Sequence, residues 1–247
     1  HNQNDSGVMK SIRDIVRNKS LSPEQQSSAY NLWGLRLSRQ GQYQEAIRQY
    51  ENAAKKDPKG AYVYMNWGNA LLLWAKSTGD SDRLNKAAQM FEKAARMKPD
   101  LAANYINWGM LLLAQNDYGE ANKKFRKASA VDSDFESIAS ASIAEVLGRQ
   151  KRYEEQTKIL SNLVELYPEY SPIYAVAFYN WGVELNEQRK YIEAIPKFQK
   201  SAEINPRFVS TYMHWGLSLF HLDKFSEAST KYQKVVELDP TSGTAYF

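Results

Sequence analysis

The dipeptide Trp-Gly occurs five times in this chain of 247 residues, and its spacing repeats. The copies are Trp33-Gly34, Trp67-Gly68, Trp108-Gly109, Trp181-Gly182 and Trp215-Gly216. The first two tryptophans are 34 residues apart, and so are the last two. A bulky residue beside glycine at constant spacing indicates that one structural unit is copied along the chain. Each unit of such an array packs against its neighbours, so the sequence predicts a repeat array with a continuous core.

The residues around each Trp-Gly predict two helices per unit. In the first copy Tyr30, Trp33, Gly34 and Leu37 follow the spacing of one helix face. Further residues recur at fixed offsets; in the first copy they are Ala46, Tyr50, Ala53 and Pro58. Glycine and alanine allow two helices to approach closely, and the aromatic side chains fill the space beside them. The proline ends the second helix, because the residue before a proline is driven out of the α region.

This pattern resembles the tetratricopeptide repeat (TPR), a unit of 34 residues with two helices, over residues 27–242. The tryptophan at the family's fourth position is usually Tyr or Phe here, and the leucine at its seventh position is Trp. The resemblance implies an all-α, right-handed superhelical solenoid of about six helix-turn-helix repeats. We expect repeats at about 27–60, 61–101, 102–135, 137–170, 175–208 and 209–242, of which the fourth is degenerate. Residues 1–26 should form a tail and an amphipathic helix, and residues 243–247 the start of a truncated helix.

Three departures from the pattern are informative. In the second repeat the pattern resumes seven residues late, after an insertion at 74–82. We expect its first helix to extend by about a turn and to be followed by a polar loop. The fourth repeat has Ala144 in place of glycine and Gln156 in place of alanine, which predicts looser packing. Pro196 should kink the second helix of the fifth repeat or shift its start.

The N-terminal segment carries an amphipathic pattern. Its apolar stripe consists of Val8, Met9, Ile12, Ile15 and Val16, and its basic residues are Lys10, Arg13, Arg17 and Lys19. Three interpretations remain open: a helix that covers the first repeat, a helix on a membrane surface, and an arm for self-association.

Composition excludes several classes of function. The net charge of +4 is only modestly basic, whereas nucleic-acid binding usually needs a concentrated basic stripe, so no nucleic-acid partner is expected. The basic cluster Lys123, Lys124, Arg126 and Lys127 is interpreted as a solvated helix face, with contact to an acidic partner or nucleic acid as the alternative. No cysteine, no glycine-rich phosphate loop and no membrane-spanning stretch is present. His214 and His221 lie two helical turns apart, about 10 Å, which is too far for one metal ion. We therefore expect no enzyme, no cofactor and no metal.

The two ends of the sequence are expected to differ from those of a complete protein. The chain begins at His1 rather than Met and stops within a helical pattern, so we expect a fragment of a longer protein. No compartment can be read from the sequence; a bacterial source would make the protein cytoplasmic or periplasmic.

Binding residues are expected on the face of each first helix that points away from its partner helix. The sixth position is Asn66, Asn107 and Asn180 in three repeats, and His214 in the last. A carboxamide can both donate to and accept from a peptide backbone. The row resembles the asparagine ladder of O-GlcNAc transferase and related TPR proteins. The alternative is that asparagine is only tolerated there.

Other residues of this face are mostly apolar, and methionine suits an adaptable binding surface. The candidate groove residues are Met65, Asn69, Ile106, Met110, Tyr179, Val183, Met213, Leu217 and Phe220. The carboxylate clamp of chaperone-binding TPR domains is absent, because its basic positions hold Met65, Ile138 and Ser142. Trp74 is a candidate second contact site, unless it packs against the insertion.

The sequence therefore predicts a protein–protein interaction scaffold or adaptor whose concave groove binds an extended or helical segment of a protein partner. One alternative is a self-assembling scaffold on a membrane or organelle surface. Membrane contact would then involve only the N-terminal helix or segments outside this sequence. The other alternative is the TPR module of a larger enzyme.

Overall fold

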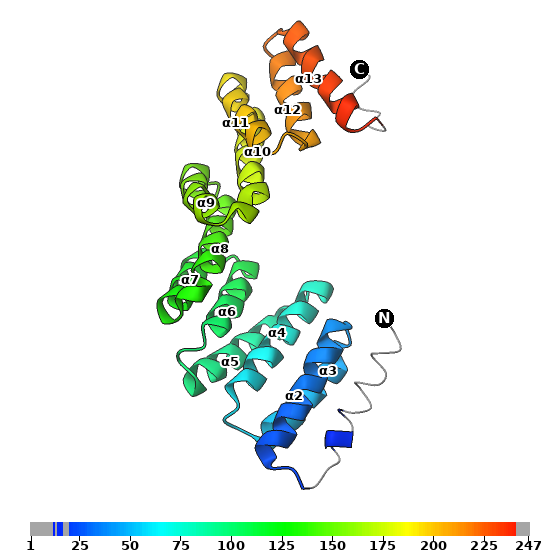
Figure 1. Cartoon of the computed structure of the whole chain (residues 1–247), viewed down its shortest axis with the longest axis vertical. Coiled ribbons are helices and arrows are strands. Elements are labelled where there is room, and N and C mark those ends of the chain that lie inside the picture. Colours follow the sequence, from blue (N-terminus) through cyan, green and yellow to red (C-terminus); the bar gives the residue numbers. More distant parts are fainter. Residues whose placement is uncertain (1–11, 13, 17–19, 241–247) are drawn as a thin grey trace. The chain divides into compact units, whose positions relative to one another are not determined.

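The computed structural model describes residues 12, 14–16 and 20–240, and all regular structure in these residues is helical. Twelve of these helices form six consecutive pairs of a first and a second helix (Figure 1). The pairs are α2 (Pro23–Arg39) with α3 (Tyr43–Lys56), α4 (Ala61–Thr78) with α5 (Ser81–Met97), α6 (Ala102–Ala114) with α7 (Tyr118–Val131), α8 (Glu136–Arg149) with α9 (Tyr153–Leu166), α10 (Ser171–Glu187) with α11 (Tyr191–Ile204), and α12 (Val209–Phe220) with α13 (Phe225–Leu238). Two short 3₁₀ helices, η1 (Ser133–Phe135) and η2 (Pro168–Tyr170), precede α8 and α10. The predicted all-α solenoid of helix pairs is confirmed.

Most residues for which helices are predicted at the two ends of the chain lie outside the described residues. Ile12 and residues 14–16 are helical, while the rest of the predicted N-terminal helix and the predicted start of a helix at 243–247 lie outside the described residues. The start of α2 is clear. Ser22 Oγ accepts from the Gln25 amide at 3.3 Å, and Gln25 Oε1 accepts from the Ser22 amide at 2.9 Å. This reciprocal cap, followed by Pro23, fixes where α2 begins.

The chain divides into two compact units, His1–Ala139 (unit 1) and Ser140–Phe247 (unit 2), with the boundary inside α8. Unit 1 contains the pairs α2–α3, α4–α5 and α6–α7. Unit 2 contains most of α8 and the helices from α9 to α13. None of the described helices combines the length and the apolar character that a membrane span requires.

The glycine of each Trp-Gly lies against an aromatic ring of the second helix. The pairs are Gly34 with Tyr50, Gly68 with Phe91, Gly109 with Phe125, Gly182 with Phe198 and Gly216 with Tyr232. A Cβ added at any of these glycines would lie 2.4–2.7 Å from the ring. The two helices of a pair can therefore approach closely only where no side chain separates them.

The fourth pair uses different residues for the same purpose. Ala144 and Leu160 replace the glycine and the ring, and both are fully buried. Gln156 replaces the small alanine, and Gly148 makes room for it, since a Cβ there would lie 2.6 Å from Gln156 Nε2. The expected looser packing is thus not seen at this position, because a second small residue compensates for the larger one.

Within a pair, the turn carries a residue in the left-handed region. Asn116, Lys151, Arg189 and Asp223 have φ of 58–60°, and Gly41 has φ of 74°. The following amide then bonds back to the first helix, for example Lys190 N to Leu185 O at 2.8 Å. This bond ends the first helix and starts the second in the same way along the chain.

A tyrosine hydroxyl links one repeat to the loop before it. Tyr64 donates to Pro58 O at 3.2 Å, Tyr105 to Pro99 O at 2.9 Å, and Tyr212 to Pro206 O at 3.1 Å. A tryptophan at this position, as in the family pattern, could not place a hydroxyl there. The tyrosine thus satisfies a loop carbonyl while its ring packs beside the next tryptophan, as in the stacked pair Tyr64–Trp67.

Two local predictions need correction. The insertion forms no polar loop: α4 continues to Thr78, and α5 begins at Ser81. Gly79 ends α4 in the left-handed region and Asp80 caps α5, so two residues complete the turn. Pro196 lies inside α11 and does not shift its start, since α11 has 14 residues like α13; the alternative, a kink of this helix, stays a prediction. The insertion has lengthened both helices of the second pair.

Candidate functional site

Positions are counted from the first residue of each repeat, which is residue 27, 61 or 102 in unit 1. Positions 2, 6, 9 and 13 lie on one side of the first helix, because they follow helical spacing. In unit 1 we call this side of α2, α4 and α6 the first-helix face. Its main residues are Leu32, Leu35, Tyr62, Asn66, Asn69, Leu73, Asn107 and Met110. Helix α4 packs against both α2 and α6, so the three helices form a continuous row (Figure 1).

The asparagines of this face differ in their partners. Asn66 Nδ2 donates to Asn31 Oδ1 at 3.1 Å, which brings the asparagine of the first repeat beside the predicted row. Asn69 and Asn107 are partly exposed, and among the described residues their side chains have no hydrogen-bond partner. Each of these two carboxamides therefore keeps a donor and an acceptor for another molecule.

Apolar side chains on the first-helix face are exposed. Leu32 is 56% exposed, Tyr62 50% and Leu73 38%. The sequence analysis did not single out these three residues, although each occupies a position that the helical spacing assigns to this face. The Tyr62 hydroxyl accepts a hydrogen bond from Lys98 Nζ at 3.0 Å, which raises the pKa of that lysine.

Some predicted groove residues also pack within unit 1. Ile106 is buried, so it is not available to a partner. Met65 and Met110 are half-buried and pack partly against the core cluster of α4, α5 and Leu111. Met65 and Ile106 occupy the fifth position of the repeat. That position faces the neighbouring first helix, because successive first helices are in contact.

In unit 2 the predicted residues fall into two groups. Asn180, Leu217 and Phe220 are exposed. Tyr179 and Val183 pack against the core beside Phe198, and Met213 is half-buried. Burial raises the pKa of Tyr179 above its usual value.

His214 joins two helices of unit 2. Its Nδ1 lies 3.0 Å from Ser210 O and 3.4 Å from the Tyr179 hydroxyl, with the two rings nearly perpendicular. Asn186, which the sequence analysis did not select, donates to His214 O at 3.3 Å and accepts from Ser218 Oγ at 2.8 Å. These contacts hold α10 against α12. His214 therefore packs between two successive repeats.

Trp74 is half-buried beside the helix that follows it. The Arg83 guanidinium carbon lies 3.8 Å from the centre of a Trp74 ring. Arg83 also donates to Thr78 Oγ1 and forms an ion pair with Asp80. One face of this tryptophan is thus covered by its own repeat, and its role as a contact site remains a prediction.

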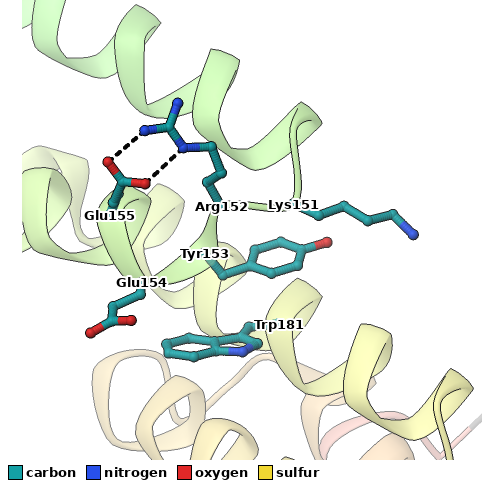
Figure 2. Close-up of a pocket in the computed structure, with 6 residues that line it drawn as sticks. All are labelled: Lys151, Arg152, Tyr153, Glu154, Glu155 and Trp181. Carbon is teal, nitrogen blue, oxygen red and sulfur yellow. Dashed lines mark hydrogen bonds and ion pairs between the residues drawn. The ribbon is translucent and has the colours of Figure 1, made fainter.

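Unit 2 contains a pocket that the sequence analysis did not predict. It is an open pocket of about 290 Å³, lined by Lys151, Arg152, Tyr153, Glu154, Glu155 and Trp181 (Figure 2). Tyr153 and Trp181 belong to successive repeats, so no pattern within one repeat could indicate their approach. Among the described residues, no group of three or more His, Asp or Glu side chains could hold a metal ion.

Comparisons with known proteins agree with this fold. Family descriptions match two segments, "TPR repeat" at residues 34–73 and "Tetratricopeptide repeat" at residues 106–171. No curated protein matches the sequence.

Solved structures resemble the chain at low sequence identity. YrrB, described as a TPR protein with an unusual peptide-binding site, is 20% identical with a TM-score of 0.50, covering 79% of this chain and 95% of its own. The pilF protein of Pseudomonas aeruginosa is 18% identical with a TM-score of 0.59, covering 89% and 94%. The C-terminal part of a TPR repeat-containing protein from Cytophaga hutchinsonii is 16% identical with a TM-score of 0.62, covering 87% and 81%. These similarities concern the fold alone.

TPR proteins serve in general as non-enzymatic modules for protein–protein interaction. Two matched repeat segments, six helix pairs within the described residues and the shared fold lead to one assignment: the chain is a tetratricopeptide repeat protein.

Proposed function

We propose that this protein is a scaffold or adaptor that binds an extended or helical segment of a partner protein on the first-helix face of unit 1. One observation carries the proposal: Asn69 and Asn107 have no hydrogen-bond partner among the described residues and lie on the same face as exposed apolar side chains. A surface that binds peptides needs both features, polar groups that pair with the backbone and apolar area that can be buried.

Polar contacts would set the position of the peptide. A carboxamide pairs with a peptide group through one donor and one acceptor, whatever the peptide sequence. The hydrogen bond from Asn66 to Asn31 holds these two side chains in place, so less conformational entropy is lost when a peptide binds.

Apolar contacts would supply most of the affinity. Leu32, Tyr62 and Leu73 lie on three different turns of α2 and α4, and all three are exposed. Burying apolar surface contributes about 25 cal/mol per Å². In unit 2, Asn180, Leu217 and Phe220 offer the same combination on α10 and α12, and we propose that they contact the same class of partner.

The proposal is tested with peptides selected from a random library on the immobilised wild-type protein. The Kd of each selected peptide is then measured for the double variant Asn69→Ala, Asn107→Ala. Loss of two backbone hydrogen bonds, each worth about 0.5–1.5 kcal/mol, should weaken binding about fivefold or more.

The matched control is Asn85→Ala, which removes an exposed carboxamide from the second helix α5. It should leave the Kd unchanged, and all proteins should have the same helical circular dichroism. Equal Kd values for the wild type and the double variant would contradict the proposal.

A further inference from the structure

The pocket in unit 2 lies between the start of α9 and the middle of α10 (Figure 2). It uses none of the residues of the first-helix face, so it can be tested separately. Its two aromatic walls are Tyr153 and Trp181, whose ring centres are 6.4 Å apart and whose planes differ by 16°. Nearly parallel rings at the edge of a pocket offer π-faces to a planar group.

Trp181 already contacts one cation of this protein. Lys197 Nζ lies 3.6 Å from the centre of its ring, and Lys197 does not line the pocket. Indole rings attract cations because the faces of the ring carry negative charge. The same contact recurs as Lys124 on Trp108 and Lys231 on Trp215, so it belongs to the packing of the repeat, and a bound group would use the part of the Trp181 ring that Lys197 does not cover.

The positively charged residues that line the pocket both form ion pairs. Arg152 binds both carboxylate oxygens of Glu155, at 2.7 and 2.6 Å. Lys151 Nζ lies 2.6 Å from Glu184, and this contact lowers the pKa of the Glu184 carboxyl. Both cations of the pocket therefore have an acidic partner.

Glu154 is the exception. It makes no ion pair with any described residue, and Figure 2 shows its carboxylate at one side of the two rings, away from the Lys151 ammonium. The Glu187 carboxylate attracts the Lys151 ammonium and so adds a further negative charge close to that lysine. Among the six residues that line the pocket, the one charge without a partner is thus negative, and it lies beside the two aromatic rings (Figure 2).

We propose that this pocket binds the guanidinium group of an arginine side chain of a partner protein. A guanidinium is planar, so it can stack on the rings of Tyr153 and Trp181 while its N–H groups donate to the Glu154 carboxylate. A lysine ammonium is compact and strongly hydrated, so it gains less from the same rings. The acidic residue and the aromatic pair together select arginine over lysine.

The test is an NMR titration of the complete chain with Nα-acetyl-arginine N-methylamide. The protein has six tryptophans, and the indole N–H signal of Trp181 is identified as the signal lost in Trp181→Phe. Arginine amide should shift this signal with saturation. The corresponding lysine amide should bind several-fold more weakly, and the citrulline amide, which is planar but neutral, should produce no saturable shift.

Variants separate charge from stacking. Glu154→Gln should weaken arginine binding about two- to fivefold, the range expected for one exposed charge pair. Glu165→Gln, an exposed substitution on the same helix, should leave it unchanged. Equal binding of arginine and citrulline amides, no shift of the Trp181 signal with arginine amide, or the same affinity in Glu154→Gln would each overturn the proposal.

Discussion

A Cβ added at Gly109 would lie 2.4 Å from Cε1 of Phe125, which is fully buried. The ring cannot retreat, because it fills the space between α6 and α7. The glycine of Trp-Gly thus has a packing role, and the same contact recurs in four other helix pairs.

Gly109→Ala should therefore destabilise the protein. Overpacking of a filled core lowers the free energy of unfolding by about 1–3 kcal/mol. Urea denaturation followed by circular dichroism measures this change. The control is Gly119→Ala in α7, where an added Cβ meets only Asp117 Oδ1 at 3.9 Å. That variant should be neutral or slightly stabilised, because alanine favours helix over glycine; a loss as large as that of Gly109→Ala would contradict the packing account.

The turn residue Arg189 should be a site where glycine stabilises the protein. Its φ of 60° lies in the left-handed region, which disfavours residues with a Cβ. Arg189→Gly should raise the free energy of unfolding by about 0.5–1 kcal/mol, after allowing for the greater entropy of unfolded glycine. Thermal unfolding measures the effect. The reverse change, Gly41→Ala at the corresponding turn, should lower stability; an increase would show that the left-handed turn is not the cause.

Stability should fall at alkaline pH, in part because of Tyr50. Burial raises the pKa of Tyr50 from 10.0 to about 12, while its hydroxyl lies 3.2 Å from Ser38 Oγ. The unfolded state ionises near pH 10 and the folded state near 12, so the stabilisation is complete below pH 10. It is then lost between pH 10 and 12 at about 1.4 kcal/mol per pH unit.

Urea denaturation at pH 9 and pH 11 tests this dependence. Tyr50→Phe should show a smaller difference between the two pH values than the wild type, although it is less stable at both. Tyr167→Phe, which removes a hydroxyl that is exposed and makes no hydrogen bond to a described residue, should keep the wild-type difference. Identical pH dependence in Tyr50→Phe and the wild type would exclude Tyr50 as the responsible group.

Contacts within a repeat could be predicted from the sequence, whereas contacts between repeats could not. Gly109 and Phe125 lie in two helices of one pair, and a glycine and an aromatic residue recur together in five repeats, which indicates that they meet. Ile106 was assigned to the groove but is buried, because the angle between successive first helices decides which side of a helix stays open. The hydrogen bond between Asn31 and Asn66 depends on the same angle.

The insertion and the pocket show two other limits. The run of polar residues after Trp74 was interpreted as a loop, but Gly79 and Asp80 complete the turn with two residues. Polar composition did not distinguish a loop from an exposed extension of a helix. The pocket between Tyr153 and Trp181 arises from the packing of α9 against α10 and has no signature in either repeat alone.

Photo-crosslinking tests the central claim most directly, because it reports which face a bound peptide touches. p-Benzoylphenylalanine is placed at residue 73 in α4 or, in a second protein, at residue 85 in α5, and each protein is irradiated with a peptide selected on the wild type. If the first-helix face binds the peptide, the protein labelled at residue 73 should crosslink to it and the protein labelled at residue 85 should not. Crosslinking at residue 85 alone, or equally at both residues, would contradict binding on the first-helix face.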